Sequence, residues 1–349
     1  MAMQTTDGAL TPGQVEDSYY QILAGGARYV LFSSLLDMNL PPLLSEKGRT
    51  AEEIIAALKL PEHRGRKWLH ALRLTGLLVA ESASEEAAPR LRLSDSLRRM
   101  FGHSGSEGWF YREFLRYYRV SMLHPLYSVL TGEKIAQTVR YPPTEHADML
   151  LLHEWMRNTA LCTLEVIRRH VDFSPVRQLL DVAGGDGTMA FELYKAYPEL
   201  TITVFNLPGP AQIVQEQAAE RGAWDRVSAL RGDFRVDPLP LGNDMVMFSR
   251  VLADWPPELC QELLHKAHRA LLPDGKLVIC EPLSDENPDL AIVWEQSYLP
   301  YDDFGLQVYK PLSLYQQMLE KAGFKILSVH PRDESTIHCV IISQRLGGP

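Results

Sequence analysis

A cluster of glycines between an apolar run and a helical pattern constrains the fold of this chain more than any other feature. The run Gln178–Val182 has the length and composition of a buried strand, and residues 181–188 (DVAGGDGT) lead from its end into a helix predicted over 189–197. Glycines at such a place let the backbone approach a ligand closely or adopt a positive φ. The segment therefore predicts a ligand-binding loop between a strand and a helix.

Strand and helix patterns alternate along the second half of the chain. We expect strands at 178–182, 201–205, 227–230, 245–249 and 276–280, helices at 189–197, 211–221, 257–271 and 315–321, and a final strand pair at 325–329 and 337–343. Repeated strand–helix units predict an α/β fold with a Rossmann-like, doubly wound and mostly parallel sheet. Ligands of such sheets bind at the carboxyl ends of the strands.

The N-terminal part has a different pattern. We expect a helix over 15–40 that Pro41 and Pro42 end, a helix to residue 58 with a capping box from Thr50 to Glu53, a helix over 61–75, and strands at 77–79 and 91–93. Two helices followed by a two-stranded wing are typical of a winged helix. The sequence thus predicts an N-terminal helical, winged-helix-like domain over 1–108, and a helical linker plus catalytic domain over 109–349.

Composition narrows the class of protein. The net charge of -9 disfavours a general nucleic-acid binder, so we interpret the winged helix as a dimerisation module, with a DNA-binding regulator as the rival reading. The four cysteines show no CxxC spacing, and His265 and His268 lack a third ligand in sequence, so we expect no disulfide framework and no metal. No signal peptide and no apolar run of about 20 residues is evident, which predicts a cytoplasmic protein without a membrane span.

The glycine loop favours a particular cofactor. Its spacing differs from the GxGxxG of a dinucleotide site, and the acidic Asp181 at the strand end suits the cationic amino group of S-adenosylmethionine. Asn206, at the end of the next strand, is placed to hold the ribose, and the Gly-Asp-Phe that follows the third strand could flank the adenine. The predicted cofactor residues are Asp181, Gly184, Gly185, Gly187, Asn206, Leu207, Gly232, Asp233, Phe234, Ser249 and Arg250.

These segments resemble the small-molecule O-methyltransferase family of caffeate and acetylserotonin type. The matching segments, spread over nearly the whole chain, are DVAGGDG at 181–187, NLP at 206–208, GDF at 232–234, VLADW at 251–255, the P-x-G-x-L strand at 273–277, Glu281-Pro282 and AGF at 322–324. Residues 132–143 and 206–209 look most like the bacterial branch that contains the bacteriochlorophyllide C-20 methyltransferase. The resemblance implies a class I methyltransferase, which transfers a methyl group from S-adenosylmethionine and releases S-adenosylhomocysteine. It also implies a homodimer with an intertwined N-terminal domain.

The departures from the family pattern concern the chemistry. Where the family has its general base, a His in VLHDW, this chain has Ala253. Two Glu residues flank that His in the family; Glu281 aligns with the first, and the second falls near Tyr309. The Lys that many members place four residues before the His becomes Ser249, and the usual ribose-binding Asp becomes Asn206.

Loss of the base limits the reaction. A phenol has a pKa of about 10, and general-base catalysis contributes about 10²–10⁴ in rate. Three outcomes are open: transfer to nitrogen or an activated ring carbon, O-transfer with another base, or a fold that binds the cofactor without transferring methyl. We favour C- or N-methylation of a small aromatic natural product. The candidate catalytic groups for the second outcome are Glu281, Tyr309, His124, Asp254 and His153.

Overall fold

The structure of this chain is a computed structural model that describes residues 12–45, 47–81, 88–102, 130–131, 146–299, 308–333 and 336–347. The chain divides into two compact units, Met1–Arg119 and Val120–Pro349. The boundary expected between residues 108 and 109 lies outside the described residues, and the domain limits stay a prediction.

The first unit is helical with one small sheet. Its described elements are α1 (Pro12–Asp37), α2 (Leu40–Leu43), α3 (Ala51–Ala57), α4 (Glu62–Leu74), β1 (Leu78–Ala80), β2 (Leu91–Leu93) and α5 (Asp95–Gly102). The capping box is confirmed, since the Thr50 side chain accepts from the Glu53 N–H and the Glu53 side chain accepts from the Thr50 N–H. The order of two helices and an antiparallel strand pair matches the expected one. Its reading as a winged-helix dimerisation module stays a prediction.

One expectation for this unit is wrong. Pro41 and Pro42 do not end the long helix; they lie in the first turn of α2, while α1 ends earlier, at Asp37. Proline is tolerated in a first turn because the N–H that it lacks would be unpaired there anyway. The break falls at Asn39, whose φ of 52° is left-handed, a conformation that asparagine adopts more readily than most residues.

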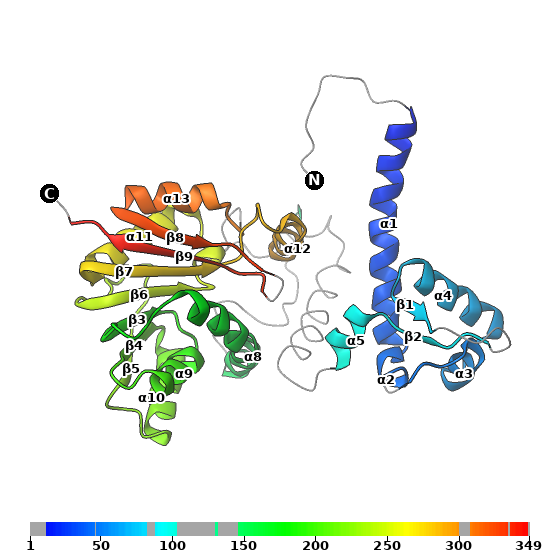
Figure 1. The fold of residues 1–349 in the computed structure, drawn as a ribbon, viewed down its shortest axis with the longest axis horizontal. Helices are drawn as coiled ribbons and strands as arrows, with labels where there is room; N and C mark the ends of the chain where they lie inside the picture. The colour runs from blue at the N-terminus through cyan, green and yellow to red at the C-terminus, as the bar shows by residue number, and fades with distance from the viewer. Residues whose placement is uncertain are drawn as a thin grey trace. The chain divides into compact units, whose positions relative to one another are not determined.

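The second unit is a sheet covered by helices on both faces (Figure 1). Its described elements are α8 (His146–His170), β3 (Gln178–Val182), α9 (Thr188–Ala196), β4 (Thr201–Asn206), α10 (Pro208–Glu220), β5 (Val227–Arg231), β6 (Asn243–Ser249), the 3₁₀ turn η1 (Leu252–Asp254), α11 (Pro257–Ala270), β7 (Leu271–Glu281), α12 (Pro288–Tyr298), α13 (Leu312–Lys321), β8 (Phe324–His330) and β9 (Cys339–Arg345). Within the described residues, seven strands form one sheet in the order β5-β4-β3-β6-β7-β9-β8.

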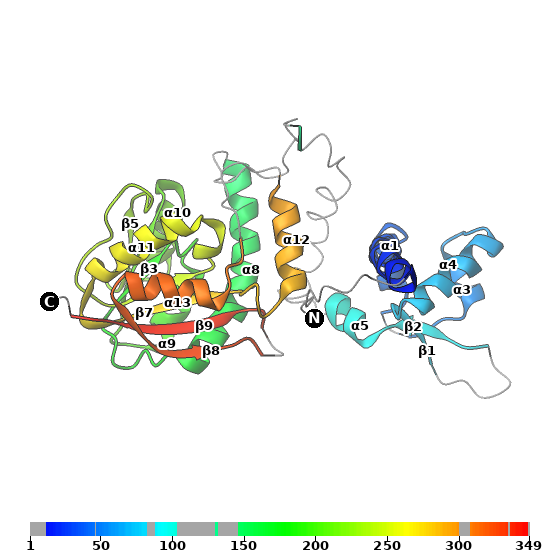
Figure 2. The same ribbon diagram turned by 90° about the horizontal axis from the view of Figure 1, so that it is seen from above.

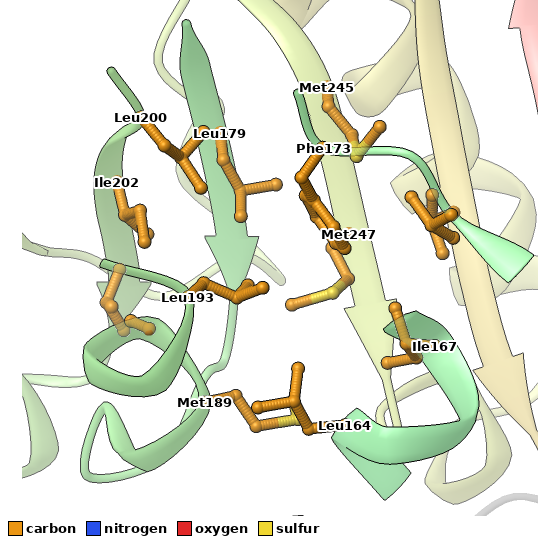
Figure 3. Packing of buried hydrophobic residues seen from close by; sticks show 14 of the residues in the cluster. Leu164, Ile167, Phe173, Leu179, Met189, Leu193, Leu200, Ile202, Met245 and Met247 are labelled. Carbon is orange, nitrogen blue, oxygen red and sulfur yellow. The ribbon is translucent and has the colours of Figure 1, made fainter. Parts of the chain in front are cut away.

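The direction of the strands confirms the predicted fold class. The five strands from β5 to β7 are parallel, and β9 runs antiparallel to both β7 and β8. Parallel strands of this kind are buried on both faces, and each face has its own apolar cluster. Figure 3 shows one of them, in which Leu164 of α8, Leu193 of α9 and Met247 of β6 meet.

Several elements differ by a few residues from the predicted bounds, among them β6, α10, α13 and β9, and two larger differences concern β7 and α12. β7 begins at Leu271 rather than at 276, because Leu271 pairs with Asn243 of the neighbouring strand β6. A register shift follows, after which Lys276 pairs with Met245. The helix α12 was not expected at all; Asn287 caps it and Pro288 occupies its first turn. In both views α8 and α12 lie at the end of the sheet where β7 ends (Figures 1 and 2).

No helix in the described part of the chain is long and apolar enough to span a bilayer.

Candidate functional site

The predicted site residues gather along one edge of the sheet. Five adjacent strands are parallel, so the segments that follow them emerge at the same edge. Those segments carry Asp181 and the glycines after β3, Asn206 and Leu207 at the end of β4, Gly232, Asp233 and Phe234 after β5, Ser249 and Arg250 after β6, and Glu281 at the end of β7. His124 and the side chain of His153 lie outside the described residues.

The loop after β3 has the conformation that its glycines permit. Gly185 and Gly187 have φ of 61° and 80°, and Gly187 caps α9. Ala183 shares this left-handed region with a φ of 57°, which costs a non-glycine residue about 1–2 kcal/mol. At Gly184 the constraint is space, because a Cβ there would lie 2.2 Å from Oδ2 of Asp181. The loop therefore brings main-chain atoms close to a buried carboxyl group.

Asp181 is the least satisfied group at this edge. Its side chain is buried, and neither carboxyl oxygen has a hydrogen-bond partner in the described structure. Burial raises the pKa of Asp181 from 3.8 to about 7, against the opposing effect of the Arg250 charge. A buried carboxylate without a partner is costly, and a cationic hydrogen-bond donor removes that cost. This arrangement fits a ligand with an ammonium group.

Asn206 links two of these segments. Its Oδ1 accepts the N–H of Leu207 at 2.9 Å, and its Nδ2 donates to the carbonyl oxygen of Gly185 at 3.2 Å. The side chain thus ties the end of β4 to the glycine loop. The amide still offers a lone pair to a hydroxyl group, because a carbonyl oxygen has two.

The segment after β5 combines a charged pair with an aromatic contact. The carboxylate of Asp233 accepts from Arg235 at 2.7–3.1 Å, and the Arg235 guanidinium holds the pKa of Asp233 below its usual value. The rings of Phe234 and Trp255 meet edge to face, 5.6 Å apart. Gly232 leaves no room for a side chain, since a Cβ would lie 2.4 Å from the Phe205 ring.

The turn after β6 contains the position of the expected base. Arg250 begins it with a φ of 57°, and its guanidinium reaches α8, where it donates to Thr159 Oγ1 and to the carbonyl oxygen of Met156 at 3.3 Å. Ala253 lies in η1 and is buried, with 5% of its surface exposed. The turn therefore presents a methyl group where the resemblance leads one to expect an imidazole.

Two predicted catalytic groups lie close to this turn. Oε1 of Glu281 accepts the N–H groups of Val251 and Leu252 at 2.7 and 2.8 Å, and burial raises the pKa of Glu281 from 4.5 to about 8. Burial also raises the pKa of Tyr309 well above its usual 10, so its phenol is neutral near pH 7. Its ring meets that of Trp294 in α12 at 6.1 Å. Asp254 ends η1.

The sequence reading missed two residues near this edge. Lys310 is fully buried and donates to carbonyl groups of η1, a long-range contact for which the sequence carries no signal. His338 immediately precedes Cys339, the first residue of β9 and the partner of Glu281 in the β7–β9 pairing. Burial, and then the Arg250 charge, lower the pKa of His338 to about 3. Its imidazole is therefore neutral near pH 7 and a poor proton acceptor.

Curated proteins similar to this chain include three methyltransferases that act on different atoms. The bacteriochlorophyllide d C-20 methyltransferase of Chlorobaculum tepidum is 30% identical over 54% of this chain and 56% of its own length. The L-tyrosine C(3)-methyltransferase of Streptomyces lavendulae is 28% identical over 87% of this chain and 85% of its own. The N,N-dimethyltransferase OxyT of Streptomyces rimosus is 27% identical over 90% of both chains. The chain thus spans just over half of the first relative and most of the other two.

Solved structures share the fold. The apo S-adenosylmethionine-dependent methyltransferase SibL has a TM-score of 0.73 at 23% identity, over 94% of this chain and 98% of its own. Human N-acetylserotonin methyltransferase, solved with S-adenosylmethionine, has a TM-score of 0.56 at 18% identity, over 98% and 99% of the two chains. The family model for the O-methyltransferase domain matches residues 130–325, more than half of the chain. The chain therefore belongs to the O-methyltransferase domain family, and it is a methyltransferase that uses S-adenosylmethionine.

Proposed function

We propose that this enzyme transfers the methyl group to a carbon or nitrogen atom of a small aromatic metabolite. The observation that carries the proposal is Ala253, a buried methyl group where the family has its general base. Attack by a phenol oxygen needs that base, whose loss costs about 10²–10⁴ in rate. An electron-rich ring carbon or an amine nitrogen attacks the methyl group with its own electron pair when the two are held in line, and the C–S bond of the sulfonium breaks. The proton that the attacking atom carries leaves to solvent after this step, so the attack itself needs orientation rather than a base.

The remaining candidate bases favour the same conclusion. Tyr309 is neutral near pH 7 because burial raises its pKa. Glu281 has one oxygen occupied by two main-chain N–H groups. Relatives whose names state C- and N-methylation give the proposal a precedent, and relatives whose names state O-methylation give one to its alternative. O-methylation with a different base, from Asp254, Glu281, Tyr309 or His124, is the alternative.

The geometry of this edge supports an assignment of the cofactor residues. We assign Asp181 to the amino group of S-adenosylmethionine, because its buried carboxyl oxygens have no partner in the described structure. Asn206 is assigned to the ribose, and residues 232–234 to the adenine. The glycine loop and Leu207, with Ser249 and Arg250 at the end of β6, complete the set. When bound, the cofactor supplies a methyl group on a sulfonium and leaves as S-adenosylhomocysteine.

Product analysis tests the proposed reaction. We expect the purified enzyme, given a mixture of small phenols and anilines and S-adenosylmethionine with a carbon-13 methyl group, to label carbon or nitrogen. The methyl chemical shift in an NMR spectrum separates the three kinds of product. Products with only O-methyl groups would overturn the preference for C- or N-transfer. Failure of calorimetry to detect S-adenosylmethionine binding would contradict the cofactor assignment as well.

Cofactor affinity should depend on the protonation of Asp181. Its carboxylate must be ionised to pair with an ammonium group, and its pKa is about 7. We therefore expect the Kd for S-adenosylhomocysteine to increase as the pH falls below 7, approaching about tenfold per pH unit. The folded-state pKa lies above the ordinary 3.8, so without ligand this group lowers stability as the pH rises towards and through 7.

Calorimetry between pH 5.5 and 7.5 measures this dependence, with Asp181→Asn as the control. The variant should bind more weakly at pH 7.5 and show a flat profile. If the wild-type Kd does not change over this range, or if the Kd of the variant changes equally with pH, another residue binds the amino group of the ligand.

A further inference from the structure

Two buried ionisable side chains bracket the turn that follows β6. Oε1 of Glu281 accepts the N–H groups of Val251 and Leu252 at 2.7 and 2.8 Å. Nζ of Lys310 donates to the carbonyl oxygens of Leu252 and Ala253 at 2.9 and 3.2 Å. Glu281 thus holds the N–H groups at the beginning of the turn, and Lys310 holds the carbonyl groups that follow. We refer to Glu281 and Lys310 together as the clamp.

The turn depends on these contacts because its own hydrogen bonds are long. Asp254 N–H to Val251 O and Trp255 N–H to Leu252 O both measure 3.4 Å, against about 2.9–3.0 Å for an ordinary bond of this kind. The turn also starts at Arg250, whose left-handed φ of 57° is unfavourable for a residue with a side chain. A strained backbone conformation of this sort persists only where the surroundings fix it.

Holding the turn with the clamp costs free energy, because both side chains are ionisable and buried. The Glu281 side chain is 1% exposed and that of Lys310 is 0% exposed. Burial raises the pKa of Glu281 to about 8 and lowers that of Lys310, so both are disfavoured in their charged forms. Burying an ionisable group is costly, and apolar side chains of similar volume would avoid that cost. What the polar pair provides here is four hydrogen bonds to main-chain groups of one short turn.

We propose that Glu281 and Lys310 are positioning residues, which fix the backbone of residues 251–254 so that the acceptor is oriented for methyl transfer. This inference rests on the proposed function and specifies how its site is held. The two side chains act through main-chain groups of the turn, and Glu281 takes no proton from the acceptor. Lys310 thereby becomes part of the catalytic apparatus without touching a reacting atom.

Substitutions at Glu281 separate positioning from proton transfer. Glu281→Gln keeps a carbonyl oxygen that can accept both N–H groups, whereas Glu281→Met removes it. We expect kcat within about threefold of wild type for Gln and a decrease on the order of 10–10² for Met, with the KM for S-adenosylmethionine unchanged in both. An equal, large loss in both variants would identify Glu281 as a general base and overturn the proposal.

Lys310 has a matched control in the same unit. Lys266 also donates to two main-chain carbonyls, Phe234 at 2.6 Å and Asp237 at 2.9 Å, but in the segment after β5. We expect Lys310→Met to lower kcat on the order of tenfold or more, and Lys266→Met to raise the KM for S-adenosylmethionine instead. The same change in both parameters for both variants would mean general loosening of the protein, which contradicts a specific clamp.

Hydrogen exchange gives a readout that needs no methyl acceptor. Peptides covering residues 250–256 should exchange faster in Glu281→Met and Lys310→Met, and at the wild-type rate in Glu281→Gln and Lys266→Met. An unchanged rate in both clamp variants overturns the clamp even if the proposed reaction is right. Faster exchange with unaltered kcat overturns its catalytic role. Should Glu281→Met fail to fold, Glu281→Gln and Lys310→Met still carry the test. If the enzyme proves to be an O-methyltransferase, the exchange result stands separately.

Discussion

Replacing Ala253 by His is expected to turn this enzyme towards O-methylation of phenols, with a rate gain on the order of 10²–10⁴ for a phenol that binds the acceptor site. The main chain of the turn that carries residue 253 is held by four hydrogen bonds, two donated to Glu281 and two donated by Lys310. An imidazole at this position would therefore be attached to a fixed backbone. An imidazole, whose unperturbed pKa is about 6.5, is unprotonated near neutral pH, so its nitrogen is available to accept the phenol proton.

Ala253→Phe is the matched control, because it adds a ring of similar size without a base. The measurement is the rate of O-methyl product from a panel of phenols, resolved by NMR from C- and N-methyl products. We expect the Phe variant to show no gain, and the gain of the His variant to decrease at acidic pH, where the imidazole is protonated. An equal gain in the two variants would show that the ring reshapes the acceptor site and that no base is involved.

Replacing Gly184 by Ala is expected to weaken S-adenosylmethionine binding by a factor on the order of 10² or more, comparable with loss of a buried charge-assisted contact. The added Cβ would lie 2.2 Å from Oδ2 and 2.5 Å from Cγ of Asp181, a separation that atoms cannot adopt. Asp181 belongs to the buried strand β3, so its carboxyl group can move away only by giving up the position from which it faces the loop.

Gly185→Ala distinguishes this clash from a general sensitivity of the loop. A Cβ at Gly185 meets no atom within 4 Å, so the substitution is opposed only by the φ of 61°, at about 1–2 kcal/mol. Calorimetry should therefore rank Gly184→Ala well below Gly185→Ala in affinity. The Gly184→Ala clash should also lower the melting temperature. In the double variant Gly184→Ala, Asp181→Ala, we expect the melting temperature to return towards that of wild type, because the clash is removed, while S-adenosylmethionine binding stays weak. Equal affinities of the two single variants would contradict the assignment of Asp181.

Much of the fold follows from local sequence signals. The strand Gln178–Val182 has its predicted bounds because the apolar run is short and a glycine loop ends it. The capping box at Thr50 and Glu53 is a local interaction and forms as expected. Where a partner decides, the sequence is less informative: β7 starts at Leu271 because it pairs with Asn243 of another strand. The helix α12 did have a local signal, the Asn287-Pro288 start, which the sequence prediction did not use.

The candidate site was predictable to the extent that its residues follow strand ends. Asp181, Asn206 and Glu281 were placed from the strands that precede them, and the structure brings those strand ends to one edge. The partners of these side chains were not predictable. Lys310 contacts carbonyl groups more than fifty residues earlier in the chain, and no spacing rule connects them. His338 depends on the pairing of β9 with β7 for its position beside Glu281.

The way the turn after β6 is held bears on how such enzymes diverge. Its hydrogen bonds from Glu281 and Lys310 all end on main-chain atoms, so none of them depends on which side chain residue 253 carries. An ancestor could exchange that side chain while keeping the local architecture intact. Lineages with different acceptor atoms could then arise by single substitutions rather than by rebuilding the scaffold. We therefore expect residue 253 to change more often in evolution than Glu281 or Lys310, and the reaction type to change with it.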